Sequence, residues 1–323
     1  MRGVILDLDS LGQGDLDLSP LLGLPGMHWE LHGSTPAENL HGRIREAEVV
    51  LSNKVVLDRE ALSRASGLRL VVVMATGTNN VDLDAAAAQG VVVCNVRNYA
   101  VASVAEHTLG LMLALARRLP EYLASSLDGS WSRSDFFCVH RGPMLELAGR
   151  RLGIVGHGAL GAAVARLGDA FGMEVSLASL PGHEHGHAPW PRLSLGELLG
   201  AVDVLSLHCP LTPQTRGLIG VQALSLMKPG AFLLNTARGA LIDEAALLAA
   251  LRGGRLGGAA LDTLDREPPP GDSALIAAAK ELPNLLVTPH VAWASREARQ
   301  RLVWQMREVI AAFRGGSPIN RVG

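Results

Sequence analysis

A glycine-rich turn between an apolar strand and a helix constrains the fold of this chain more than any other feature. The apolar residues 152–155 run into Gly156, Gly158 and Gly161, and a helical pattern follows to residue 171. In this context the spacing G-x-G-x-x-G is typical of a turn that holds a dinucleotide. The first glycine permits the tight turn, the second lets the backbone approach the pyrophosphate, and the third lets the helix pack on the strand. The phosphates would lie at a helix N-terminus, where free N–H groups favour negative charge.

The same alternation of apolar runs and helical segments fills the chain. Strands are predicted at residues 4–8, 49–51, 70–74, 91–94, 152–155, 174–178, 202–207, 231–235, 258–261 and 285–288. Helical patterns cover residues 59–66, 82–89, 103–123 and 295–313, among others. Continuous apolar runs suit parallel strands that are covered on both faces. We therefore expect an α/β protein in which the part after Arg151 is a doubly wound sheet.

Composition excludes several classes of partner. The 323 residues suffice for about two domains, and a net charge of −2 argues against nucleic acid. The longest apolar stretch, residues 109–116, is too short to span a membrane, and Asp7 and Asp9 interrupt the apolar start, so no membrane contact and a cytoplasmic location are expected. Cys94, Cys138 and Cys209 lack a metal-like spacing and are expected to be reduced thiols.

No metal site is expected either. The alternating histidines of a Gly- and Pro-rich loop are the only candidate, and no acidic or cysteine cluster accompanies them; they are His183, His185 and His187.

The end of the second strand of the doubly wound sheet bears on the choice of cofactor. An acidic residue usually binds the adenosine ribose at this point, but here the position is Ser179. A serine does not repel a 2′-phosphate. However, Leu180, Pro181 and Gly182 supply no positive charge, and the next arginine in sequence is Arg192. NAD(H) is therefore the favoured cofactor, and NADP(H) stays open.

Three later strands are each followed by polar residues suited to acid–base chemistry. Arg238 follows the strand at 231–235, Glu267 follows the one at 258–261, and His290 follows the one at 285–288. A guanidinium suits the bidentate binding of a carboxylate, and histidine is the natural proton donor near neutral pH. A carboxylate partner would stabilise the protonated imidazole and fix its tautomer. Taken singly, each residue also has a structural explanation as a surface arginine, a solvated acid or a capping histidine. By the same reasoning His107, within a helical pattern, is expected to be structural.

Taken together, the motifs resemble those of the D-isomer-specific 2-hydroxyacid dehydrogenases. They are G-H-G-A-L-G at 156–161, N-T-A-R-G at 235–239, D-x-x-x-x-E-P at 262–268 and T-P-H-x-A-W at 288–293. Further matches are S-N-K at 52–54, A-T-G-T-N-N-V-D at 75–82, S-V-A-E-H-T at 103–108 and H-C-P-L at 208–211. The glycerate dehydrogenase (hydroxypyruvate reductase) branch is the most similar.

The resemblance implies a role for each matching residue. Arg238, Glu267 and His290 would be catalytic. Asn53, Thr76 and Gly77, together with Arg238 and His290, would bind the substrate. The cofactor would contact the glycine turn and neighbouring strand ends, namely Gly156, Gly158, Ala159, Leu160, Gly161, Ser179, Cys209, Pro210, Thr236, Ala237, Arg238, Asp262, His290 and Trp293, with Thr108 from the long helix.

The resemblance also implies a layout of two Rossmann-like domains with a cleft between them. A discontinuous, flavodoxin-like substrate-binding domain would comprise residues 1–98 and 290–323. A doubly wound NAD(P)-binding Rossmann domain would comprise residues 99–289. The helix after Ser103 and the segment 131–140 would form a homodimer contact.

Four functions remain open at this point. The first is an oxidoreductase that transfers hydride between NAD(P)H and a small 2-keto or D-2-hydroxy acid, with hydroxypyruvate or glyoxylate as substrate. Formate dehydrogenase is similar in fold, but it transfers no proton and has glutamine in place of Glu267. Phosphoglycerate dehydrogenase would be expected to carry a regulatory domain after Gly323 and a basic cluster for phosphate. A cofactor-sensing corepressor could retain the same three residues.

Overall fold

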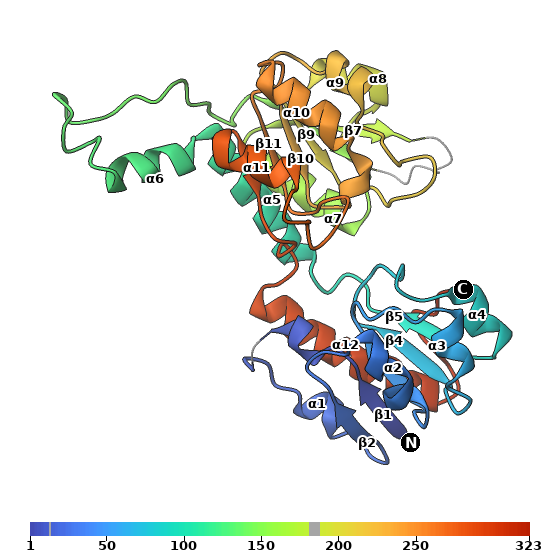
Figure 1. Ribbon diagram of the computed structural model, residues 1–323. Coiled ribbons are helices and arrows are strands. Elements are labelled where there is room, and N and C mark those ends of the chain that lie inside the picture. The colour runs from blue at the N-terminus through green and yellow to red at the C-terminus, as the bar shows by residue number, and fades with distance from the viewer. Residues whose placement is uncertain (13, 181–187) are drawn as a thin grey trace. The chain divides into compact units, whose positions relative to one another are not determined.

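The chain folds into two compact units (Figure 1). The computed structural model describes residues 1–12, 14–180 and 188–323. The first unit comprises Met1–Ala100 and Ala294–Gly323, and the second comprises Val101–Trp293. The sequence predicted that the first domain ends at residue 98 and resumes at residue 290. The first unit ends at Ala100 and resumes at Ala294.

The first unit is a parallel sheet of five strands. Its elements are β1 (Arg2–Ile5), the 3-10 helix η1 (Leu8–Leu11), α1 (Ser19–Leu22), β2 (His28–Leu31), α2 (Ala37–Ile44), β3 (Val49–Ser52), α3 (Arg59–Ser63), β4 (Leu70–Val73), α4 (Leu83–Ala88), β5 (Val92–Asn95) and α12 (Arg296–Arg314). The strand order β2-β1-β3-β4-β5 is the flavodoxin-like order, which confirms that prediction.

Helices cover both faces of this sheet, which is why its strands are apolar on both sides. α2, α3 and α4 pack against one face, where Val4, Val50 and Val71 are buried. α12 packs on β4 and against α1 (Figure 1). The prediction of a helix at 295–313 that returns to the first domain is therefore confirmed.

The second unit is a parallel sheet of seven strands. Its elements are α5 (Val101–Ala116), α6 (Leu119–Leu127), β6 (Arg151–Val155), α7 (Ala159–Ala170), β7 (Glu174–Ser179), β8 (Arg192–Ser194), α8 (Leu195–Ala201), β9 (Val204–Leu207), α9 (Val221–Leu226), β10 (Phe232–Asn235), the 3-10 helix η2 (Gly239–Leu241), α10 (Glu244–Arg252), β11 (Gly258–Leu261), α11 (Ala274–Glu281) and β12 (Leu285–Val287). The order β12-β11-β10-β9-β6-β7-β8 is doubly wound, with its switch point between β6 and β9. Ligands of such sheets bind at the carboxyl ends of the strands near this point.

Two hydrophobic clusters lie on the two faces of the seven-stranded sheet. One is formed with α8 to α11 and contains Leu198, Leu247 and Leu275. The other is formed with α5 and α7 and contains Met112 and Val164. α5 therefore lies against the sheet and not at its periphery. No helix of the described residues is long and apolar enough to cross a membrane.

The secondary structure differs from the prediction in one strand boundary, in two additional strands and in one helix. The first strand spans Arg2–Ile5 and not residues 4–8, because the chain turns into η1 after Asp7. Two strands, β2 and β8, were not predicted. Both are edge strands with half-buried or exposed residues, so they lack the apolar run by which the other strands were recognised.

The single long helix predicted at 103–123 is in fact two helices. α5 ends at Ala116, and Arg118 adopts a left-handed backbone with φ of 50°. Pro120 lies in the first turn of α6, where its missing N–H costs no helical hydrogen bond. The apolar pattern continues through the break, and for this reason the break was not evident from periodicity.

Candidate active site

The glycine turn joins β6 to α7 and has the geometry that a dinucleotide requires. Gly156 has φ of 100°, and a Cβ there would clash with the backbone of Cys209 on the neighbouring strand end. A Cβ at Gly161 would clash with the carbonyl oxygen of Gly156. A Cβ at Gly158 would meet no protein atom, so the fold itself does not require glycine there. The missing side chain instead leaves space for a ligand. These residues fit a pyrophosphate at the N-terminus of α7.

His157, inside this turn, contacts an aromatic ring and lies near two positive charges. Its ring and that of Trp190 make an edge-to-face contact with centroids 5.9 Å apart. Burial lowers the pKa of His157, and the nearby positive charges of Arg192 and Arg166 lower it further. Arg192 is on β8, which pairs with β7 so that Ser194 lies opposite Ser179. The fold therefore brings Arg192 near the glycine turn, although the two are far apart in sequence.

The turn after β10 carries Arg238. The buried Asn235 closes this turn: its Oδ1 accepts from the N–H of Ala237 (3.0 Å) and its Nδ2 donates to the carbonyl of Arg238 (2.8 Å). A Cβ at Gly239 would clash with the backbone of Leu264 and the next residue, so only glycine lets this turn pack on the loop that follows β11. The half-buried Arg238 donates to the carbonyl of Ala237 (2.7 Å), and no carboxylate among the described residues forms an ion pair with it. Its guanidinium is available for an anionic ligand.

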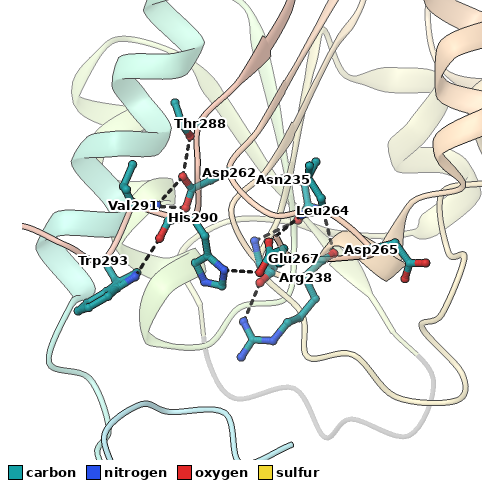
Figure 2. Close-up of polar contacts among 12 residues, drawn as sticks. Asn235, Arg238, Asp262, Leu264, Asp265, Glu267, Thr288, His290, Val291 and Trp293 are labelled. Atoms are coloured by element: carbon teal, nitrogen blue, oxygen red, sulfur yellow. Dashed lines mark hydrogen bonds and ion pairs between the residues drawn. The ribbon is translucent and has the colours of Figure 1, made fainter. Parts of the chain in front are cut away.

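Glu267 and His290 form a hydrogen-bonded pair (Figure 2). The Nδ1 of His290 lies 2.6 Å from Oε2 of Glu267, and the other oxygen of Glu267 accepts from the N–H of Leu264 at 2.8 Å. Because a carboxylate only accepts, Nδ1 must carry the proton. About 30% of each side chain is exposed. The Nε2 of His290 makes no hydrogen bond with any described residue, which leaves it to exchange a proton with a substrate.

The backbone of His290 is strained and held in place. Its φ of 54° is left-handed, a conformation that non-glycine residues adopt mainly where the surroundings enforce it. Its N–H donates to the carbonyl of Asp262 (2.9 Å), and its carbonyl accepts from Nε1 of Trp293 (2.9 Å). The carboxylate of Asp262 accepts from the N–H groups of Val291 and Ala292, both at 2.9 Å. Figure 2 shows this turn beside the Glu267 pair, with Arg238 next to it.

The strand end after β9 lies directly behind the glycine turn. Burial lowers the pKa of His208 to about 4, so the ring is neutral, and its Nε2 lies 2.8 Å from the hydroxyl of Ser206. Burial also raises the pKa of the Cys209 thiol to about 11, and this side chain belongs to the hydrophobic core. A cofactor contact at Cys209 would therefore use its backbone. Among the other expected cofactor residues, the hydroxyls of Thr108 and Thr236 lie 3.0 Å apart.

The residues expected to bind the substrate from the N-terminal part all lie in the first unit. Asn53 follows β3, and Thr76 and Gly77 lie in the loop after β4. Asp7 organises the first of these loops, because its carboxylate accepts from the N–H groups of Asn53 (2.9 Å) and Lys54 (2.7 Å). This role of Asp7 is not evident from the sequence, because its partners lie far along the chain.

The structure brings together Arg238, Glu267 and His290 in the second unit, at the strand ends where they were predicted. The roles assigned to these and the other expected residues remain predictions. Pro181, Gly182, His183, His185 and His187 lie outside the described residues, so the expectation that this loop binds no metal is also still a prediction.

The chain is similar in sequence and structure to known dehydrogenases. The family described as D-isomer specific 2-hydroxyacid dehydrogenase, NAD binding domain, matches residues 109–292. A glycerate dehydrogenase of Methylorubrum extorquens is 43% identical over 322 residues, which are 99% of this chain and 98% of that protein. A hydroxypyruvate reductase of Blautia hydrogenotrophica is 34% identical over 326 residues, 100% of this chain and 99% of that protein. Among solved structures, the D-lactate dehydrogenase of Aquifex aeolicus complexed with NAD and lactic acid has a TM-score of 0.82 at 28% identity, over 98% of this chain and 96% of that one.

Proposed function

The chain belongs to the D-isomer-specific 2-hydroxyacid dehydrogenases, and on that premise we propose that it reduces hydroxypyruvate to D-glycerate with NADH. The observation that carries the proposal is the 2.6 Å hydrogen bond between Glu267 and Nδ1 of His290, which leaves Nε2 free to act on a substrate. Full-length similarity to a glycerate dehydrogenase and a hydroxypyruvate reductase supports this choice of substrate.

In this mechanism Arg238 binds the carboxylate of the keto acid and polarises the neighbouring carbonyl. The turn of Gly156, Gly158 and Gly161 would hold NADH, which would supply the hydride for the keto carbon. His290, protonated on both nitrogens, donates the Nε2 proton to the carbonyl oxygen as it becomes an alkoxide. Glu267 stabilises the imidazolium and holds its ring in orientation. Oxidation of D-glycerate reverses these steps, with His290 as the base.

The pair of Glu267 and His290 also favours this reaction over the oxidation of formate. Oxidation of formate removes a hydride and leaves carbon dioxide, so no proton has to be exchanged with an alcohol oxygen. A carboxylate-supported imidazole such as that of His290 is suited to a reaction that does exchange this proton.

For the cofactor, Ser179 gives NAD(H) no carboxylate contact to the adenosine ribose. Arg192 and Arg166 act on His157 in the glycine turn, so the cofactor site has more positive charge than the neighbouring sequence indicated. NAD(H) is the favoured cofactor, and we expect weaker discrimination against NADP(H) than in a relative with an acid at position 179.

A panel of substrates tests both proposals. Hydroxypyruvate, glyoxylate, pyruvate and 3-phosphohydroxypyruvate would be assayed with NADH and with NADPH, and formate with NAD⁺. We expect the highest kcat/KM with hydroxypyruvate and NADH. Turnover of formate, or of no 2-keto acid, would contradict the proposed function. A preference for NADPH would contradict the cofactor assignment alone, and loss of that preference in Arg192→Ala would then identify the phosphate ligand.

We also propose that the protein is a homodimer joined through an arm formed by α6 and residues 128–145. The arm extends from the body of the second unit (Figure 1). Large apolar side chains are exposed along it, including Leu123, Leu127, Trp131, Phe136 and Phe137; Leu127 and Phe137 are 88% and 92% exposed. An apolar surface of this kind is typical of an interface between proteins.

Charged residues introduced into the arm should separate the subunits. In the double variant Leu127→Glu/Phe137→Glu, a dimer would bury two carboxylates without partners. We therefore expect a monomer of 34.0 kDa in place of a dimer of twice that mass. Sedimentation velocity measures this difference. The matched control is Val221→Glu, an exposed apolar residue on α9, which should stay dimeric. A wild-type monomer, or a double variant that stays dimeric, would contradict the proposal.

A further inference from the structure

A chain of hydrogen bonds joins α5 to the turn that carries His290. Nε2 of His107, on α5, lies 3.0 Å from the hydroxyl of Thr288, at the end of β12. That hydroxyl donates to Oδ1 of Asp262, at the end of β11, over 2.6 Å. The three residues lie on α5, directly after β12 and directly after β11, all in the second unit.

The donor and acceptor roles in this series of hydrogen bonds are fixed. A threonine hydroxyl has a single hydrogen, and the carboxylate of Asp262 can only accept one. The hydroxyl of Thr288 therefore donates to Asp262 and accepts from His107. It follows that Nε2 of His107 carries a hydrogen, either as the neutral Nε2–H tautomer or as the imidazolium.

The same carboxylate holds the catalytic turn. Asp262 is almost completely buried, and besides Thr288 it accepts from the N–H groups of Val291 and Ala292. The hydroxyl of Ser103, also on α5, donates to the carbonyl of Ala292 at 2.6 Å. α5 thus contacts the turn through Ser103, and His107 reaches Asp262 both through Thr288 and directly, since its Nε2 lies 3.6 Å from Oδ1 of Asp262. A strained residue such as His290 keeps its conformation only when contacts of this kind enforce it.

We propose that His107 and Thr288 are positioning residues, which hold Asp262 in the orientation that keeps His290 in its left-handed conformation. This assigns a function to His107, which the sequence reading took to be structural. The inference rests on the proposed function, because it concerns the proton that His290 donates. Neither residue needs to touch the substrate or the cofactor. Their loss should therefore slow the proton transfer more than it weakens binding.

Kinetics of paired variants test the proposal. Thr288→Val keeps the shape but removes the hydroxyl, and His107→Leu removes the donor. We expect kcat to fall about tenfold in each, with KM for the keto acid changed less than about threefold. Thr288→Ser keeps the hydroxyl and His107→Gln keeps an N–H donor, so both should recover most of the activity. Melting temperature and NADH binding, measured on every variant, identify any that misfold.

The matched control is Thr263→Val. Thr263 is the neighbour of Asp262, and its buried hydroxyl has no hydrogen-bond partner among the described residues. The substitution is the same as in Thr288→Val but lies outside the hydrogen-bonded chain, so kcat should stay within about twofold of the wild type. An unchanged kcat in well-folded Thr288→Val, or His107→Gln no better than His107→Leu, would overturn the proposal.

A spectroscopic test avoids turnover altogether. Two-bond ¹H–¹⁵N correlation spectra of histidine-labelled, cofactor-free protein report the tautomer of each imidazole, and His107→Gln identifies the signals of His107. A hydrogen on Nε2, in the neutral or the protonated ring, is the expected result. The Nδ1–H tautomer would overturn the proposal even if the enzyme reduces keto acids. Conversely, a wild type that reduces no keto acid contradicts the proposed function and leaves the spectroscopic result to decide the hydrogen-bond chain.

Discussion

Arg238→Ala is expected to lower kcat/KM for the keto acid by about 100-fold or more, while the affinity for NADH stays within about twofold. The guanidinium is half-buried and has no carboxylate partner among the described residues, so its charge is available for the substrate. The glycine turn on β6 and α7 is a separate structure and should still bind the cofactor. Steady-state kinetics with hydroxypyruvate and fluorescence titration with NADH measure the two effects.

Two further variants sharpen this test. Arg238→Lys keeps the charge but loses the planar fork, so its kcat/KM should lie between those of the wild type and alanine. Arg216→Ala removes an exposed arginine whose nearest acid, Asp265, is also exposed at 3.7 Å, and it should stay within about twofold of the wild type. Wild-type kinetics in Arg238→Ala would remove this arginine from the mechanism.

Glu267→Gln should lower kcat/KM at neutral pH by about tenfold or more, and reduction should decline at a lower pH than in the wild type. The carboxylate accepts from both Leu264 and His290, whereas an amide has only one acceptor oxygen. The amide also carries no charge to stabilise the imidazolium that donates the proton. Reduction needs that proton, and the pH profile of kcat/KM for hydroxypyruvate records its loss.

The neighbouring acid Glu244 provides the control. Its Oε1 accepts from the N–H of Asp265 at 3.0 Å, so it supports the same loop as Glu267. Since no described contact joins it to His290, Glu244→Gln should leave the pH profile in place. An unmoved profile in Glu267→Gln, or an equal shift in both variants, would show that the carboxylate does not act on His290.

The parts of the fold that could be predicted are those encoded locally. Gly156, Gly158 and Gly161 could be recognised because their spacing falls between an apolar strand and a helical pattern, all within one short segment. Arg238 and His290 could be located because polar residues that follow apolar parallel strands meet at one edge of the sheet. Each of these inferences needs only the residues immediately before and after it.

What could not be predicted depends on residues far apart in sequence. The bond between His107 and Thr288 joins positions 181 residues apart, and those between Asp7 and residues 53–54 span almost 50. Both α7 and β7 lie between the glycine turn and Arg192 in the sequence, so only the pairing of β7 with β8 reveals that Arg192 is near His157. Without the strand order, nothing in the sequence relates these positions.

Edge strands and the break in the long helix were missed for a different reason. β2 and β8 are paired on one side only and carry polar residues, which weakens the apolar signal. At Arg118 the backbone reverses its handedness while the apolar pattern continues. Apolar periodicity alone therefore does not locate these strands or this break.

The discontinuity of the first unit imposes an order on folding during synthesis. All residues of the second unit, Val101–Trp293, are made before α12, which completes the first unit. Until then one face of the five-stranded sheet lacks five large apolar side chains of α12 that are completely buried in the finished protein: Leu302, Val303, Met306, Val309 and Ile310. The second sheet can therefore form on the ribosome while the first, although translated earlier, still exposes an uncovered apolar face. We therefore expect the nascent N-terminal sheet to be more prone to misfolding during synthesis than the second sheet.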